Sequence, residues 1–351
     1  MGLPTFKAEL LVKFVVIEMS VSNSQGAESY TKPRRGALSC LPSSWVPYAE
    51  LMRIDKPIGG LNIYFPYLFG SLFAACVRHN SITPESVLAA NLRLYPMAIL
   101  LRSAGCTWND IIDRNLDRQV ARTRFRPMAR NAVSLKNGLT FYGVQMAIFL
   151  VILSSTDLQT ISYATTAILL GHIYPFAKRV TNYPQVVLGL SLSWGVLVGC
   201  TFQGISPLTL AIRYPSSAVA LGCLCLSYCS WTIIHDTIYA FQDIQDDTKA
   251  GIKSMSRRHE KHATRLLLSL ALLQVTFHIA TGIAMRAGVL YYLGACVAPA
   301  ALLGLMVIRV DVRDPQICWW WFRHGSLIIG WTVALGLIGE YGQRLRSAEE
   351  L

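Results

Sequence analysis

The chain has 351 residues, of which 53% are hydrophobic and only 15% are charged, and its formal net charge is +12. An average soluble domain carries about 25% charged residues, so the composition argues against a soluble globular protein and favours a membrane-embedded one. The basic charge does not indicate nucleic-acid binding, because Lys and Arg lie between apolar runs of membrane-spanning length. The nine cysteines form no CxxC pair and indicate no disulfide framework.

The N-terminal segment differs in composition from the rest of the chain. Residues 20–46 are rich in Ser, Gly and Pro, which is typical of a flexible segment. The apolar run at 9–17 contains Glu9 and Lys13 and lacks the Arg-rich, acid-poor character of a mitochondrial transit peptide. We therefore expect a flexible leader over 1–50, a helix bundle over 51–345 and a short tail over 346–351. The leader favours the endoplasmic reticulum over the mitochondrial inner membrane.

The apolar runs that follow are continuous and have the length of membrane-spanning helices, about 20 residues each. A transmembrane β-barrel would instead need short segments of alternating polarity. We expect an all-α, multi-pass membrane bundle of about nine transmembrane helices. The expected spans are 58–77, 92–112, 138–155, 158–176, 185–203, 217–241, 265–285, 287–308 and 324–341.

The connecting loops alternate in charge. Loops after even-numbered spans are basic, as in 114–136 and 249–265, whereas loops after odd-numbered spans hold few charges. Cytoplasmic loops carry the excess of Lys and Arg. With nine spans and a cytoplasmic N-terminus, every basic loop falls on one side of the membrane.

Two acidic motifs of matching spacing lie on that same side, each at the end of an apolar run. They occupy Asn109–Asp117 and Gln242–Asp247, in a chain that has only 20 Asp and Glu. Carboxylates beside apolar segments cost solvation energy unless a cation is held there. Mg²⁺ takes hard oxygen ligands, including phosphate oxygens. The pair of motifs therefore predicts a diphosphate held through Mg²⁺, and the alternative is a pair of solvated helix ends.

The spacing of the acids selects the candidate ligands. Asp110, Asp113 and Asp117 fall on one face of a helix. In the second motif, Asp243 pairs with Asp246 or Asp247 one turn later.

Basic side chains near the motifs suit anionic oxygens. Among them we expect Arg126, Lys178 and Lys253 to bind the ligand, with Arg179 beside Lys178. For Arg257, Arg258 and Lys261, a role in setting membrane topology is favoured.

These motifs, together with their flanking residues, resemble the UbiA superfamily of intramembrane aromatic prenyltransferases over roughly residues 50–340. Within it, the chain is similar to the 4-hydroxybenzoate polyprenyltransferase branch and most like fungal members that farnesylate phenolic polyketide acids. One departure is Arg130-Asn131, where members often have a glycine; Asn tolerates the left-handed backbone that such a turn needs. The matching segments are Leu51–Gly59, Asn109–Arg118, Arg124–Ala129, Tyr174–Arg179, Tyr183–Gln185, Asp236–Asp247 and Gly251–Ser254.

The resemblance implies that Mg²⁺ holds a prenyl diphosphate, with farnesyl diphosphate favoured, between the two motifs. Asp110, Asp113 and Asp117 would form one half of the metal site. Asp243 and Asp247 would form the other half, with Asp246 as an added or alternative ligand. The implied partners are this diphosphate, a phenolic acceptor and the lipid bilayer, without nucleic acid; the oligomeric state is left open.

Several residues have candidate roles toward the acceptor. Arg53 would pair with an aromatic carboxylate or anchor the chain at the interface, and Asn109 would bind the acceptor or a metal-bound water. Asp236 would orient Tyr239 or take a proton. Tyr174 would face the carbocation or pack in the core.

Two alternatives remain at the level of sequence. One is an ion-coupled transporter, which would place acids near the bilayer centre rather than at one interface. The other keeps the prenyltransferase and changes the acceptor, as in ubiquinone biosynthesis, where 4-hydroxybenzoate is prenylated, or in prenylation of haem, chlorophyll or lipids.

Overall fold

The computed structural model describes residues 30–32 and 36–349, without the side chains of Ile58 and Glu349. The chain divides into two units, 1–34 and 35–351, and the architecture below is that of the second unit. The leader expected over 1–50 lies largely outside the described residues, although helical structure already begins at Ala37. The expected tail at 346–351 is helical as far as Glu349. The three-part division itself stays a prediction.

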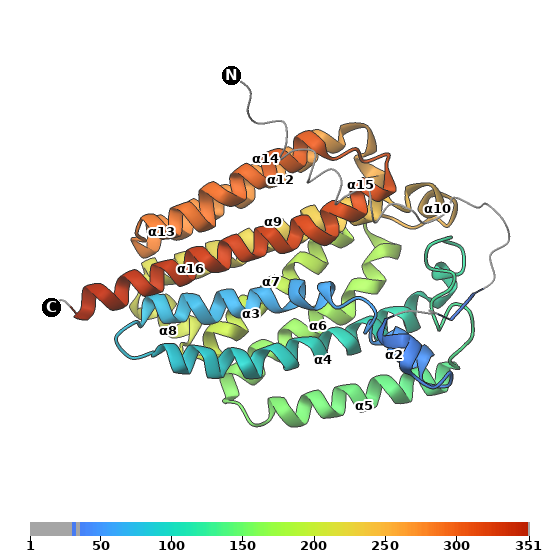
Figure 1. Cartoon of the computed structure of the whole chain (residues 1–351), viewed down its shortest axis with the longest axis horizontal. Helices are drawn as coiled ribbons and strands as arrows, with labels where there is room; N and C mark the ends of the chain where they lie inside the picture. Colours follow the sequence, from blue (N-terminus) through green and yellow to red (C-terminus); the bar gives the residue numbers. More distant parts are fainter. Residues whose placement is uncertain (1–29, 33–35, 350–351) are drawn as a thin grey trace, which may run out of the picture. The chain divides into compact units, whose positions relative to one another are not determined.

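All regular structure in the described residues is helical, as predicted (Figure 1). The elements are η1 (Ala37–Cys40), α2 (Val46–Leu51), α3 (Ile58–Val77), α4 (Pro84–Asp117), α5 (Leu135–Leu153), α6 (Leu158–Val180), α7 (Pro184–Phe202), α8 (Pro207–Arg213), α9 (Pro215–Phe241), α10 (Ile244–Lys249), α11 (Met255–Arg258), η2 (Glu260–His262), α12 (Ala263–Met285), α13 (Val289–Tyr291), η3 (Tyr292–Val297), α14 (Ala298–Arg309), α15 (Pro315–Trp320), η4 (Trp321–Gly325) and α16 (Ser326–Glu349).

Each of the nine predicted spans falls on a long helical segment. In the described part of the chain, seven helices are long and apolar enough to cross a membrane. The two remaining segments, α4 and α6, fall outside that group. Helix α4 carries Arg93 and Arg102 along its length, and α6 is rich in Thr and Ser. The count of nine crossings therefore stays a prediction.

Helix starts follow the local sequence. Proline occupies the first turn of α4, α7, α8 and α9, where its missing N–H is not needed. Thr83, Ser134 and Asp157 cap α4, α5 and α6 by accepting a hydrogen bond from the backbone three residues on. These capping residues and prolines therefore determine the residue at which each helix begins.

Glycines bring the central helices into close contact. A Cβ at Gly70 on α3 would lie 1.9 Å from the carbonyl oxygen of Val196 on α7, and one at Gly199 would lie 2.0 Å from that of Tyr67. Small residues of this kind let helix backbones approach closely in a bilayer. Helix α7 packs in turn against α6 and α9, and α3 packs against α4 and α16. These contacts hold the helices that carry the acidic motifs in one bundle.

The acidic motifs lie at the same end of this bundle. Helix α4 ends at Asp117, and α9 ends at Phe241, just before α10. Figure 1 places α10, α2 and the loop after α4 at that end. In that loop, Asn131 has φ +61°, which is the left-handed backbone expected at this turn.

Candidate active site

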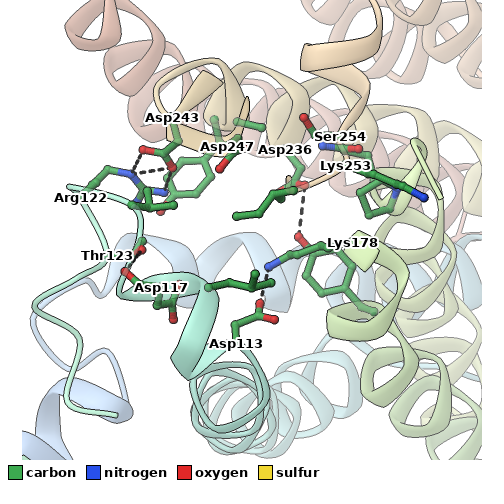
Figure 2. A pocket seen from close by; sticks show the side chains of 18 of the residues that line it. Asp113, Asp117, Arg122, Thr123, Lys178, Asp236, Asp243, Asp247, Lys253 and Ser254 are labelled. Carbon is green, nitrogen blue, oxygen red and sulfur yellow. Dashed lines mark hydrogen bonds and ion pairs between the residues drawn. The ribbon is translucent and has the colours of Figure 1, made fainter. Parts of the chain in front are cut away.

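A pocket opens where α4, α6, α7 and α9 meet the loops after α4 and α10 (Figure 2). It contains about 640 Å³ of empty space, part of it open to the surroundings. Acidic residues of both motifs line it, together with basic and aromatic side chains. The lining residues are Asp113, Leu116, Asp117, Val120, Arg122, Thr123, Arg126, Tyr174, Lys178, Pro184, Gln185, Asp236, Tyr239, Ala240, Asp243, Asp247, Ile252, Lys253 and Ser254.

Asp113 on α4 is buried and held by two cations from α6. Its carboxylate accepts hydrogen bonds from Lys178 Nζ at 2.8 Å and from Arg179 Nη1 at 3.1 Å. Lys178 also contacts Asn109 Oδ1 at 3.3 Å. The C-terminal end of α6 therefore supplies positive charge directly to the first motif, as Figure 2 shows for Lys178 and Asp113.

Asp110 is fully buried one turn earlier on α4. Its Oδ1 accepts hydrogen bonds from Arg53 Nη2 at 2.7 Å and from Arg126 Nη1 at 3.3 Å, whereas its Oδ2 has no partner among the described residues. Arg126 Nη1 also reaches Asp117 Oδ2 at 3.0 Å. Burial alone would lower the pKa of Arg126, but Asp110 and Asp117 more than offset this and raise it. Arg126 therefore stays cationic between two acids of the first motif.

Asp243 precedes α10 and is paired with Arg122 of the loop after α4. Arg122 Nε donates to Asp243 Oδ1 at 2.8 Å and to Oδ2 at 3.0 Å. The guanidinium also bonds the hydroxyl of Tyr239 and lies 4.4 Å from the centre of its ring. Tyr239 in turn packs on Phe322, with ring centres 4.5 Å apart. The second motif thus binds the loop that follows the first motif (Figure 2).

Asp246 and Asp247 are adjacent but face different surroundings. Asp246 lies outside the pocket lining, and its Oδ2 accepts a hydrogen bond from the backbone N–H of Ala121 at 2.8 Å. Asp247 lines the pocket, is buried, and has no side-chain hydrogen bond within residues 36–349. Burial and the nearby Asp243 raise the pKa of Asp247 to about 7. A divalent cation bound beside Asp247 would therefore stabilise the ionised form of this carboxylate.

The wall of the pocket formed by α6 and α9 is polar and aromatic. Tyr174 OH donates to Asp236 Oδ2 at 3.4 Å, and Lys178 Nζ lies 4.9 Å from the centre of the Tyr174 ring. Asp236 and Tyr174 both line the pocket and are therefore within reach of a group bound there. This arrangement suits proton transfer or orientation of a hydroxyl group.

The donor set fits Mg²⁺ in chemistry, although its ligands are not gathered around one point. Within residues 36–349, no three acidic, His or Cys side chains lie close enough to share an ion. Asp113 and Asp243 are instead neutralised by Lys178 and Arg122. Acids from both motifs nevertheless line one pocket, and Asp247, which has no side-chain partner among the described residues, would supply the hard oxygen that Mg²⁺ prefers.

Comparison with known proteins identifies the family. The model of the UbiA prenyltransferase family matches residues 63–328. The chain belongs to this family. A mitochondrial 4-hydroxybenzoate polyprenyltransferase of Schizosaccharomyces pombe is 32% identical over 90% of this chain and 86% of the relative. The DMOA farnesyltransferase nvfB of Aspergillus novofumigatus is 37% identical over 74% of this chain and 78% of the relative.

Solved structures share the fold of this prenyltransferase. The apo structure of a UbiA homolog from Aeropyrum pernix K1 has a TM-score of 0.60 and 23% identity, and the match covers 84% of this chain and 99% of that one. A UbiA homolog from Archaeoglobus fulgidus bound to GPP and Mg²⁺ has a TM-score of 0.58 and 17% identity, with the same coverage. The predicted family and helical fold are thus confirmed, and membership of an enzyme family decides against a transporter.

The structure brings ten of the fifteen predicted site residues of this prenyltransferase into the pocket lining. Their chemical roles stay predictions. Five others lie outside the lining: Arg53, Asn109, Asp110, Arg179 and Asp246. Three of the five contact a lining residue directly: Asp110 bonds Arg126, Asn109 contacts Lys178, and Arg179 bonds Asp113. Arg53 is linked to the lining only through Asp110.

Sequence reasoning did not select four polar residues that line the pocket: Arg122, Thr123, Gln185 and Ser254. Arg122 lies in a loop with several other arginines, so spacing alone did not single it out. Gln185 follows the proline that begins α7, and its Oε1 accepts a hydrogen bond from the backbone N–H of Met255 at 3.1 Å. Only the tertiary fold places these side chains beside the acidic motifs.

Proposed function

We propose that this prenyltransferase transfers a farnesyl group from farnesyl diphosphate to an aromatic carbon of a phenolic acid, in a Mg²⁺-dependent reaction. One observation carries the proposal: acids of both motifs, with Lys178, Arg126 and Lys253, line a single pocket at the polar end of a membrane bundle. The similarity to nvfB, named as a farnesyltransferase, favours farnesyl. A phenolic polyketide as acceptor and the endoplasmic reticulum as location follow from the resemblance and the leader.

The donor end of the pocket combines opposite charges. Asp113, Asp117, Asp243 and Asp247 would hold Mg²⁺, with Asp110 and Asp246 as further candidates. The metal ion would neutralise the diphosphate and favour its departure. Lys178 and Arg126, released from their carboxylates, would pair with the phosphate oxygens. Their ion pairs hold both cations at the pocket, where they would face the developing charge of the leaving group.

The reaction would break the bond between allylic C1 and the diphosphate oxygen, and the bonding electron pair would leave with the diphosphate. The aromatic carbon would then form the new bond to C1 and lose its proton to a base, for which Asp236 is the candidate. Tyr174 and Tyr239 offer aromatic faces toward the cationic carbon. The apolar helices around the pocket limit the access of water, which would otherwise capture this carbon.

The acceptor end is assigned to Arg53, in the turn between α2 and α3, and to Asn109 on α4. Arg53 bonds Asp110 in the absence of ligand, and an acceptor carboxylate would compete for the same guanidinium. Asn109 lies beside Lys178 and would bind the phenol.

A panel of substrates tests the proposal. Microsomes containing the chain would be incubated with geranyl, farnesyl and geranylgeranyl diphosphates against several phenolic acids, and products would be identified by mass spectrometry. We expect farnesyl transfer to a substituted phenolic acid, with an inactive Asp243→Asn chain as control.

The second candidate is 4-hydroxybenzoate prenylation, which the similarity to the Schizosaccharomyces pombe enzyme favours. Transfer of long prenyl chains to 4-hydroxybenzoate, with none to the other acids, would establish that reaction instead.

A further inference from the structure

A basic surface segment beside the pocket is not used by the proposed chemistry. It runs from α11 through η2 into the first turn of α12. Within residues 256–265 it contains four Lys or Arg and a single acid, Glu260. The four cations, Arg257, Arg258, Lys261 and Arg265, are all exposed, and none forms a salt bridge within the described ranges.

The segment lies at the start of a helix that is long and apolar enough to cross a membrane. Arg265 is on α12, one and two turns before the exposed Leu268 and Leu272. Residues at i, i+3 and i+7 share a helix face, so Arg265 continues the lipid-facing side of α12 at its polar end. A cation at this position lies at headgroup level rather than over the bundle interior.

The same segment is joined to the pocket by short contacts. Ser254, a lining residue in Figure 2, caps α11 by accepting a hydrogen bond from the N–H of Arg257 at 3.2 Å. The next residue, Met255, donates its N–H to Gln185 of the lining. His259 contacts the Tyr183 hydroxyl at 3.4 Å, immediately before α7 begins. A ligand that holds this segment would therefore stabilise one wall of the pocket.

We propose that Arg257, Arg258, Lys261 and Arg265 form a binding site for the headgroup of an anionic phospholipid. The bound lipid supports activity by stabilising the part of the pocket wall that Ser254 and Gln185 form. Charge complementarity and the lipid-facing position of Arg265 favour a membrane lipid over a soluble anion. Each cation near an anionic surface contributes about 1 kcal/mol, which corresponds to about a fivefold change in affinity. The effect on activity rests on the proposed function, whereas lipid binding does not.

The test compares two double variants of the full-length protein. Arg258→Gln with Lys261→Gln removes two cations of the site, neither of which lines the pocket. Arg309→Gln with Arg313→Gln is the matched control, since it also removes two charges, at the end of α14 and in the following loop, which contains Asp311 and Asp314. Each protein would be placed in phosphatidylcholine nanodiscs with and without phosphatidylserine. Retained phosphatidylserine would be measured by native mass spectrometry, and prenyl transfer would be measured in the same samples.

We expect the wild type and the control to retain phosphatidylserine. The variant with Arg258→Gln and Lys261→Gln should bind it roughly 10- to 30-fold more weakly. Equal retention by all three proteins, or equal loss in both variants, would overturn the site. Retention that inorganic phosphate abolishes at low concentration would assign the cations to a soluble anion and overturn the lipid proposal. If no prenyl transfer is found in any sample, the retention result still decides the site, because it needs no turnover.

Discussion

At the scale of single residues, the two neighbouring acids of the second motif are not equivalent. Sequence spacing left Asp246 and Asp247 as alternatives beside Asp243. The structure separates them, because Asp246 binds the N–H of Ala121 and Asp247 faces the pocket unpaired within the described residues. A buried carboxylate with no partner is costly, and a bound cation would remove that cost.

Replacing these two acids should therefore have unequal effects. Asp247→Asn should lower kcat/KM about 100-fold or more, the scale found when a group that stabilises transition-state charge is lost. Asp246→Asn weakens the contact with Ala121 that positions the loop after α4, and it should lower kcat/KM about tenfold. Steady-state rates at saturating Mg²⁺ would measure both. Equal losses in the two variants would contradict the assignment of Asp247 as the ligand.

The raised pKa of Asp247 predicts that Mg²⁺ dependence varies with pH. With a pKa of about 7, the carboxyl is largely protonated at pH 6 and ionised at pH 8. A metal ion binds the ionised form and displaces the proton, so affinity is lost as pH falls. The Mg²⁺ concentration for half-maximal activity should rise about tenfold between pH 8 and pH 6. This shift should be absent in Asp247→Asn, and a shift retained there would assign it to another group.

At the scale of elements, close contact between α3 and α7 fixes the frame that carries the site. Gly70 and Gly199 each face a backbone carbonyl of the opposite helix. A side chain there has no flexible neighbour to displace, so the helices themselves would have to separate. Since α7 also packs on α6 and α9, that separation would move Lys178 and Asp243 as well.

Gly199→Ala should thus destabilise the protein by about 1–3 kcal/mol, the usual cost of overpacking. Gly222→Ala is a suitable control, because nothing lies within 4 Å of the added Cβ on α9 and alanine favours a helix. Thermal unfolding in detergent would compare the two. A melting temperature for Gly199→Ala that matches wild type would show that α3 and α7 pack less closely than described.

At the scale of the whole molecule, the charge pattern of the loops implies that α4 crosses the membrane, although its charged residues keep it outside the seven most apolar spans. Its two ends carry exposed polar residues, Ser81 before it and Gln119 after it. If α4 spans, these residues face opposite compartments.

Cysteines introduced by Ser81→Cys and Gln119→Cys should react from opposite sides of sealed vesicles. A membrane-impermeant maleimide, compared with the parent chain to account for the exposed Cys40, would report the side of each. Gln119→Cys should be labelled in the compartment that also exposes the loop after α10. Labelling of both positions from one side would reduce the number of crossings.

Removing divalent cations with a chelator tests whether the whole enzyme depends on Mg²⁺. Purified enzyme treated with EDTA should lose prenyl transfer, and added Mg²⁺ should restore it, because four pocket carboxylates would otherwise repel the diphosphate. Calcium added in place of magnesium is an informative control, since it prefers more ligands at longer distances. Full activity in EDTA would exclude the metal-dependent mechanism.

The sequence by itself determined the helical membrane fold, the positions of the long helices and the two acidic motifs. These features depend on local periodicity, apolar length and capping residues, which neighbouring residues specify. The left-handed turn at Asn131 was also predictable, because few residue types tolerate it.

Only the tertiary structure decided which charged groups meet. Arg122 and Asp243 are far apart in the chain, and the pairing of Lys178 with Asp113 depends on how α6 packs beside α4. The separation of Asp247 from Asp246 and the burial of Asp110 outside the pocket lining have the same origin. Long side chains select their partners by distance in space, and that distance is set by helix packing rather than by the order of residues.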